Sequence, residues 1–157
     1  PLIAAGGITD GYEIAELMGK YGADGVQLAT RFVLTKECDV ADAFKQTYLH
    51  ARKEDIVLID SPVGLPGRAI RNRFLDRLFG GGDVYDGECR RGCLKHCSHR
   101  FCIIDRLDMS QAGDAEEGLV FAGENVWKIK DVPTVRELID RLVAEAEKIY
   151  APVPAPA

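Results

Sequence analysis

The hydrophobic pattern at the start of the chain predicts a strand, a helix and a second strand. Residues 1–5 form an unbroken apolar run that ends at Gly6–Gly7, a pattern typical of a strand buried on both faces. A helical periodicity follows, and residues 25–28 form a second short apolar run. A strand, a glycine-rich turn, a helix and another strand make a βαβ unit, so the sequence predicts an α/β protein with parallel strands.

The helix of this unit carries signals at both of its ends. Thr9 or Asp10 can cap its first turn, with Glu13 as the capping-box partner, and Gly22 is a typical C-terminal residue. Its apolar positions recur at spacings of three and four: Ile14, Leu17, Met18 and Tyr21. We therefore expect one face of this helix to be buried.

The rest of the chain gives weaker patterns, apart from one long amphipathic segment near its end. We expect helices over 40–53 and 69–79, a strand over 56–59, a Pro/Gly loop over 61–67 and a short apolar run at 119–121. The strongest helical stripe runs from Thr134 to Tyr150. Residues 151–157 alternate proline with alanine or valine, which predicts a solvated extended tail.

Composition narrows the classes of function. The chain of 157 residues is 46% hydrophobic and 29% charged, which allows a buried core, and its net charge is -5. An acidic chain is a poor match for phosphate backbones, so we expect a small-molecule substrate and no nucleic-acid partner. No apolar run is long enough to span a membrane and no secretory signal is visible, so we expect a cytoplasmic protein that does not bind membranes.

Candidate binding groups follow the two predicted strands. The amides of Gly6–Gly7 can approach an anion closely, although two glycines can also form a simple tight turn. Residues 27–31 follow the second strand and present a small side chain, Ala29, and a hydroxyl, Thr30; Arg31 could add charge or be a surface residue. Amides and a hydroxyl at two successive strand ends are like the phosphate site of a TIM barrel.

These same segments carry a family resemblance. The stretches PLIAAGGITDG at 1–11 and GADGVQLATRF at 22–32 closely resemble the nitronate monooxygenase family, and the related FMN-dependent enoyl-acyl-carrier-protein reductases share the pattern. The resemblance continues through SPVGLPGRAIRN at 61–72, GCLK at 92–95, and GLVFAG at 118–123.

The resemblance implies a fold and a domain organisation. We expect the last βα units of an FMN-binding (β/α)8 barrel over 1–60, then a family-specific loop, a cysteine-rich segment and a C-terminal helix over 61–150, and the tail over 151–157. A whole barrel needs about 250 residues. The expected architecture is therefore an incomplete barrel with a mainly helical extension, and the Pro1 start, without a methionine, fits a C-terminal fragment.

The resemblance also assigns a cofactor and its contacts. Carried over by position, the residues that bind FMN are Gly6, Gly7, Gln27, Leu28, Ala29 and Thr30. Ala29 departs from the glycine usual in the family, and its methyl could narrow the approach of the phosphate. The family's catalytic histidine comes from an earlier strand, so we expect no catalytic residue here and no activity from this chain alone.

Three functions follow as hypotheses. The first is nitronate monooxygenase activity, in which flavin oxidises an alkyl nitronate and then reacts with O2. The second is NAD(P)H-dependent reduction of an enoyl thioester or a quinone with the same flavin. The third, of a different class, is a non-catalytic interaction module.

Two further groups of residues are candidates. Four cysteines lie within 14 residues without the paired spacing of zinc sites, and packed free thiols, a metal or iron–sulfur site, and disulfides stay open for them: Cys89, Cys93, Cys97 and Cys102. Arg68 and Arg71 follow the Pro/Gly loop and could meet an anionic substrate or a nicotinamide phosphate, or they could be surface charges.

Overall fold

The computed structural model describes residues 1–82, 84, 89 and 91–149, and the predicted tail at 151–157 lies outside this range. The described residues are mixed α/β and form two compact units. Unit 1 comprises Pro1–Asp39 and the described part of Lys128–Ala157, and unit 2 comprises Val40–Trp127. The structure thus groups the C-terminal helix with the first βα segments. Among the described residues, no helix is both long and apolar enough to cross a membrane.

Unit 1 contains the predicted βαβ unit. Strand β1 (Ile3–Ala5) and strand β2 (Gly25–Gln27) pair in parallel, and helix α1 (Gly11–Gly19) connects them. The N-cap of α1 is Asp10, whose carboxylate accepts from the Glu13 N–H, while the Glu13 carboxylate accepts from the Thr9 N–H at 2.6 Å. The capping residues read from the sequence are therefore confirmed.

Burial within this unit differs from the prediction. Ile3 in β1 is 53% exposed, so the expectation of a strand buried on both faces is wrong for the described residues, where β1 pairs with β2 alone. Tyr21 lies beyond the end of α1 and is also exposed. The face of α1 that is buried centres on Gly11 and Ala15, because α1 packs against the C-terminal helix there.

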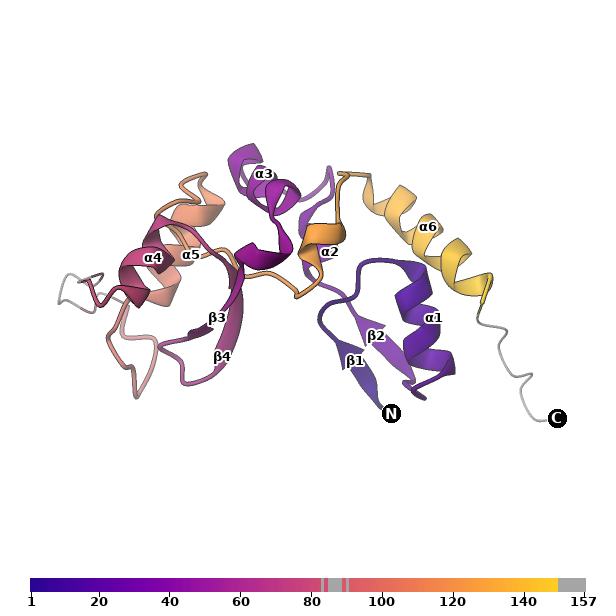
Figure 1. Ribbon diagram of the computed structural model, residues 1–157, viewed down its shortest axis with the longest axis horizontal. Helices are drawn as coiled ribbons and strands as arrows, with labels where there is room; N and C mark the ends of the chain where they lie inside the picture. Colours follow the sequence, from indigo (N-terminus) through magenta and orange to yellow (C-terminus); the bar gives the residue numbers. More distant parts are fainter. Residues whose placement is uncertain (83, 85–88, 90, 150–157) are drawn as a thin grey trace. The chain divides into compact units, whose positions relative to one another are not determined.

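Two more helices complete unit 1. The short helix α2 (Thr30–Val33) follows β2, and the predicted C-terminal helix is α6 (Val135–Glu147). A capping box between Thr134 and Glu137 begins α6. Figure 1 shows α1 between the β1–β2 pair and α6. Gly11 lies so close to the backbone of Leu142 that no side chain fits between them.

Unit 2 is built on an antiparallel hairpin. Strand β3 (Ile56–Asp60) pairs with β4 (Pro66–Ile70), and Ala69 also bridges to Phe121. The other described helices are α3 (Asp42–His50), α4 (Arg73–Phe79) and α5 (Ile103–Gln111), with two 3-10 turns at Lys53–Asp55 and Val126–Lys128. The second turn ends at Lys128, where the chain returns to unit 1. The core of unit 2 includes Phe74, which meets Phe101 edge-to-face.

Strand β4 corrects two of the predicted boundaries. Residues 66–67 belong to β4 and not to the predicted loop, and residues 69–70 belong to the same strand and not to the predicted helix. Helix α4 begins only at Arg73, after the N-cap Asn72. The loop and helix signals are local, whereas this strand depends on pairing with β3. The sequence analysis did not predict α5.

Candidate functional site

The predicted phosphate-binding residues follow β1 and β2, which run in the same direction. Ala5 pairs with Gln27 at the carboxyl ends of the two strands. Because neighbouring parallel strands end at the same sheet edge, Gly6–Gly7 and residues 28–30 leave the sheet side by side. The structure therefore brings the six residues predicted to contact FMN to one edge of the β1–β2 pair.

The Gly6–Gly7 turn has an unusual backbone, with open space beside Gly6. Their φ angles are 87° and 75°, in the left-handed region that favours glycine. A Cβ placed on Gly6 would have no heavy atom within 4 Å, so the space beside this backbone is open. An anion can reach the main chain here without meeting a side chain.

The second loop leads directly into α2. Ala29 occupies the N-cap position of α2 and provides no side-chain hydrogen bond to the first turn. The amides of a helix's first turn need acceptors from outside the helix, and an anion can supply them. Ala29 has φ -119°, so alanine adopts this backbone without strain although the family usually has glycine. The role of the two loops in FMN binding stays a prediction.

Arg31 does not lie on the surface. Its side chain is 4% exposed, and its Nη2 donates to Asp131 Oδ1 at 2.7 Å. The other Asp131 oxygen pairs with Arg141 Nη2 on α6, also at 2.7 Å. Burial lowers the pKa of Arg31, and the neighbouring Asp131 opposes that effect. This bridge joins α2 to α6, and no local pattern in the sequence indicated it, because Arg31 and Asp131 lie 100 residues apart.

Arg68 and Arg71 lie in unit 2 and pair with neighbouring acids. Arg68 Nη2 lies 3.2 Å from Glu124 Oε2, and Arg71 Nε lies 2.6 Å from Asp76 Oδ1. All four side chains are about half exposed or more. These pairs agree with surface charges, and the substrate or nicotinamide role of Arg68 and Arg71 stays a prediction.

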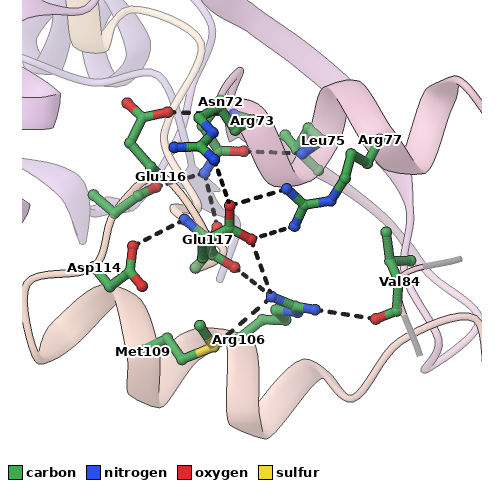
Figure 2. Close-up of polar contacts among 12 residues, drawn as sticks. Asn72, Arg73, Leu75, Arg77, Val84, Arg106, Met109, Asp114, Glu116 and Glu117 are labelled. Carbon is green, nitrogen blue, oxygen red and sulfur yellow. Dashed lines mark hydrogen bonds and ion pairs between the residues drawn. The ribbon is translucent and has the colours of Figure 1, made fainter. Parts of the chain in front are cut away.

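Next to Arg71, a buried asparagine joins the start of α4 to the segment at 115–118. The Asn72 amide donates to the carbonyls of Ala115 and Gly118, at 2.6 and 2.8 Å, while its Oδ1 accepts from the Leu75 N–H. Figure 2 shows Asn72 beside a set of arginines around Glu117. Asn72 is therefore a structural residue. It begins α4 and holds residues 115–118, which precede the stretch at 119–121 that lies beside β4.

Glu117 is the common acceptor in this cluster. It pairs with Arg77 of α4, and Arg106 of α5 lies 3.8 Å from its carboxylate (Figure 2). Arg106 also donates to the Glu117 carbonyl at 2.7 Å and stacks on the Phe74 ring. The hydrogen bond from Arg77 is the main cause that lowers the pKa of Glu117. The cluster connects α4 to α5 through Glu117, which gives the charged side chains in this part of unit 2 a structural role.

The four clustered cysteines line one small pocket together with His99 and Phe101. All are free thiols and form no disulfide, and burial raises the pKa of Cys102. Among the residues that the structure describes, no group of three or more histidine, cysteine or acidic side chains could hold a metal ion. Cys89 and Cys93 are exposed and Cys97 and Cys102 are partly buried, so the role of these thiols stays a prediction.

Curated proteins with similar sequences are longer than this chain. A dehydrogenase from Mycobacterium tuberculosis, named for (3aS,4S,5R,7aS)-5-hydroxy-7a-methyl-1-oxo-octahydro-1H-indene-4-carboxyl-CoA, is 29% identical over 93% of this chain and 49% of its own length. A probable nitronate monooxygenase from Staphylococcus haemolyticus is 35% identical over 98% of this chain and 40% of its own. The chain thus spans about half or less of these relatives.

Solved structures and family profiles agree with the sequence resemblance. The nitroalkane oxidase from Streptomyces ansochromogenes superimposes with a TM-score of 0.73 at 26% identity, over 95% of this chain and 40% of that one. The nitronate monooxygenase profile matches residues 1–145. The chain therefore belongs to the nitronate monooxygenase family of flavin-dependent oxidoreductases.

Proposed function

We propose that this chain supplies the FMN phosphate site of a nitronate monooxygenase that oxidises alkyl nitronates with O2. The observation that carries the proposal is the shared edge of β1 and β2, where Gly6–Gly7 and Ala29–Thr30 leave the sheet side by side. Membership of the nitronate monooxygenase family supports the flavin as the ligand of this edge.

The chain's own residues bind and orient in this proposal. The backbone N–H groups of Gly6 and Ala29 would donate to phosphate oxygens. The Arg31–Asp131 pair would fix α2, which directly follows Ala29. When bound, FMN supplies the redox chemistry, accepting electrons from the nitronate and passing them to O2. We expect the catalytic histidine outside these 157 residues.

The phosphate site is tested by adding a negative charge to it. In the full-length protein, Thr30→Glu places a carboxylate where the FMN phosphate would bind. We expect the affinity for FMN to fall by about tenfold or more, equivalent to about 1.4 kcal/mol. Riboflavin lacks the phosphate, so its affinity should change little. Flavin fluorescence titration measures both constants.

The matched control is Thr47→Glu on α3, which adds the same charge in unit 2. It should leave both affinities unchanged. Equal losses of FMN and riboflavin affinity in Thr30→Glu would indicate general damage to the site. An unchanged FMN affinity would contradict the placement of the phosphate at this edge.

The second candidate function is NAD(P)H-dependent reduction of an enoyl thioester or a quinone. The Mycobacterium tuberculosis relative favours it, because its name describes a dehydrogenase of a CoA thioester. Anaerobic mixing of the full-length flavoprotein separates the two functions. Rapid flavin bleaching by an alkyl nitronate, but not by NADH or NADPH, supports the monooxygenase; the reverse result supports the reductase.

A further inference from the structure

The Glu13 carboxylate holds the turn between Gly6–Gly7 and α1. Glu13 Oε2 accepts from the Thr9 N–H at 2.6 Å and from the Thr9 hydroxyl at 3.0 Å. The other oxygen, Oε1, accepts from Lys128 Nζ at 2.7 Å, and the Glu13 side chain is only 23% exposed. Both carboxylate oxygens are therefore engaged, and they fix the main chain two residues after Gly7.

Glu13 keeps its charge in this arrangement. Burial raises the pKa of its carboxyl group, but the hydrogen bonds from Lys128 and Thr9 outweigh burial and lower the pKa overall. Hydrogen bonds to an ionised carboxylate are stronger than those to a neutral acceptor. Lys128, in the segment before α6, supplies the matching positive charge. These contacts form a Thr9–Glu13–Lys128 network that ties the turn to the C-terminal part of unit 1.

The segment that this network fixes begins with two glycines. Gly6 and Gly7 have positive φ angles, and glycine loses more conformational freedom on ordering than any other residue. The residues that follow are held, because Ile8 is buried and Thr9 is bonded to Glu13. A ligand binds more tightly to a loop that is already ordered, since ordering the loop then does not oppose binding. Holding Thr9 should therefore favour the binding of a phosphate at Gly6.

Other carboxylates occupy the start of α1. The Gly11 N–H donates to Glu145 Oε2 at 2.9 Å, and the Glu13 N–H donates to Asp10 Oδ1 at 2.8 Å. Together with the Thr9 N–H on Glu13, three backbone donors at 9–13 already have acceptors. This supports a phosphate contact at Gly6 rather than at the first turn of α1.

We propose that Glu13 is a positioning residue for the phosphate end of FMN, because by binding Thr9 and Lys128 it holds the Gly6–Gly7 turn in the conformation that meets the phosphate. The inference rests on the proposed function, since it needs the FMN phosphate at the β1–β2 edge. Glu13 itself does not contact the cofactor. Its negative charge alone would repel a phosphate, so positioning and simple electrostatics predict opposite effects when Glu13 is neutralised.

Glu13→Gln in the full-length protein tests this opposition. A glutamine side chain has one acceptor oxygen, so it cannot accept from both Thr9 and Lys128 as the carboxylate does. We expect the affinity for FMN to fall about fivefold, the effect of one lost hydrogen bond. The affinity for riboflavin, which lacks the phosphate, should change little. Flavin fluorescence titration measures both constants, and Glu16→Gln, which removes the same charge from an exposed position of α1, should alter neither.

Thr9→Val keeps the test decisive if Glu13→Gln fails to fold. It removes only the 3.0 Å hydroxyl bond and changes no charge, so a loss of FMN affinity by about twofold, without a loss for riboflavin, supports positioning. An unchanged FMN affinity in Thr9→Val would then overturn the proposal.

In a folded Glu13→Gln protein, an FMN affinity that is unchanged or higher overturns the proposal, and so do equal losses for FMN and riboflavin. Thr30→Glu reports separately on the proposed function. If Thr30→Glu lowers FMN affinity and Glu13→Gln does not, the placement of the phosphate stands and only the role of Glu13 fails. If neither variant lowers FMN affinity, the placement of the phosphate fails as well.

Discussion

At the scale of single residues, Asp131 holds two arginines that belong to different helices. Replacing it by asparagine leaves the buried Arg31 guanidinium without its anionic partner. We expect Asp131→Asn to lower the free energy of unfolding by about 1–3 kcal/mol, the usual cost of an unsatisfied buried group. Urea denaturation of the full-length protein, followed by circular dichroism, measures this. Asp140→Asn changes an exposed acid of α6 and should have little effect; an equal midpoint for wild type and Asp131→Asn would contradict the role of Asp131.

Glu117 predicts how the stability of unit 2 depends on pH. Its pKa is lowered in the folded protein, mainly by the hydrogen bond from Arg77, so the folded state favours the carboxylate form. This stabilisation is present above the unfolded pKa, about 4.3, and is lost as the pH falls through the lower folded value. Glu117→Gln should cost roughly 1 kcal/mol at pH 7, as surface ion pairs do, and the difference should shrink toward pH 3.

Denaturation of both proteins at several pH values between 3 and 7 measures this difference. Glu147→Gln, which removes an exposed carboxylate of α6, controls for the loss of one charge. A difference that stays constant across this pH range would show that Glu117 acts through packing and not through its charge.

At the scale of elements, the sequence predicted those features that depend on contacts between residues close together in the chain. The capping residues of α1 were visible because Asp10 and Glu13 lie three residues apart. Strand β4 was hidden because Pro66 and Gly67 are typical of loops, and only pairing with β3 makes the segment extended. The glycines and residues 28–30 were predicted as a site because strand ends follow from the βαβ pattern. Arg31's partner could not be predicted, since Asp131 is distant in sequence.

The contact between α1 and α6 is sensitive to one added methyl group at Gly11. A Cβ on Gly11 would overlap the Leu142 carbonyl and Ala146 nitrogen, which are backbone atoms that cannot rotate away. We expect Gly11→Ala to lower the free energy of unfolding by about 1–3 kcal/mol through overpacking. Gly19→Ala adds the same methyl at the exposed end of α1 and should be neutral or slightly stabilising.

Thermal denaturation of the full-length variants compares the two substitutions. A melting temperature for Gly11→Ala equal to that of Gly19→Ala would show that α1 and α6 do not pack as closely as the structure has them. A selective loss in Gly11→Ala would confirm that the last helix of the chain is part of the same core as the first.

At the scale of the whole molecule, unit 1 joins segments from both ends of the chain. The first 39 residues and the described residues from Lys128 onward form one compact unit, while the described part of 40–127 forms the other. Hydrophobic periodicity identifies helices but does not say which helices pack together, so the sequence placed the C-terminal helix with the segment before it. The structure shows that α6 instead covers α1, and that the bridge through Asp131 ties this helix to α2.

The β1–β2 pair also bears on what this chain can do alone. Leu2 and Ile3 are 62% and 53% exposed, although parallel strands are normally covered on both faces. The relatives are longer, and the chain spans 49% and 40% of two of them. We therefore expect further strands of the longer protein to cover this surface and to contribute the rest of the flavin site.

The matching prediction compares residues 1–157 with the full-length protein. We expect the 157-residue chain to retain little FMN after purification and to show no nitronate-dependent O2 consumption, because its proposed contacts reach only the phosphate end of the cofactor and nothing in it is expected to act on the nitronate. The full-length protein should show both properties. An oxygen electrode and the flavin absorbance of each preparation measure them, with circular dichroism to establish that the short chain is folded. Turnover by the folded 157-residue chain would mean that the catalytic groups lie within it.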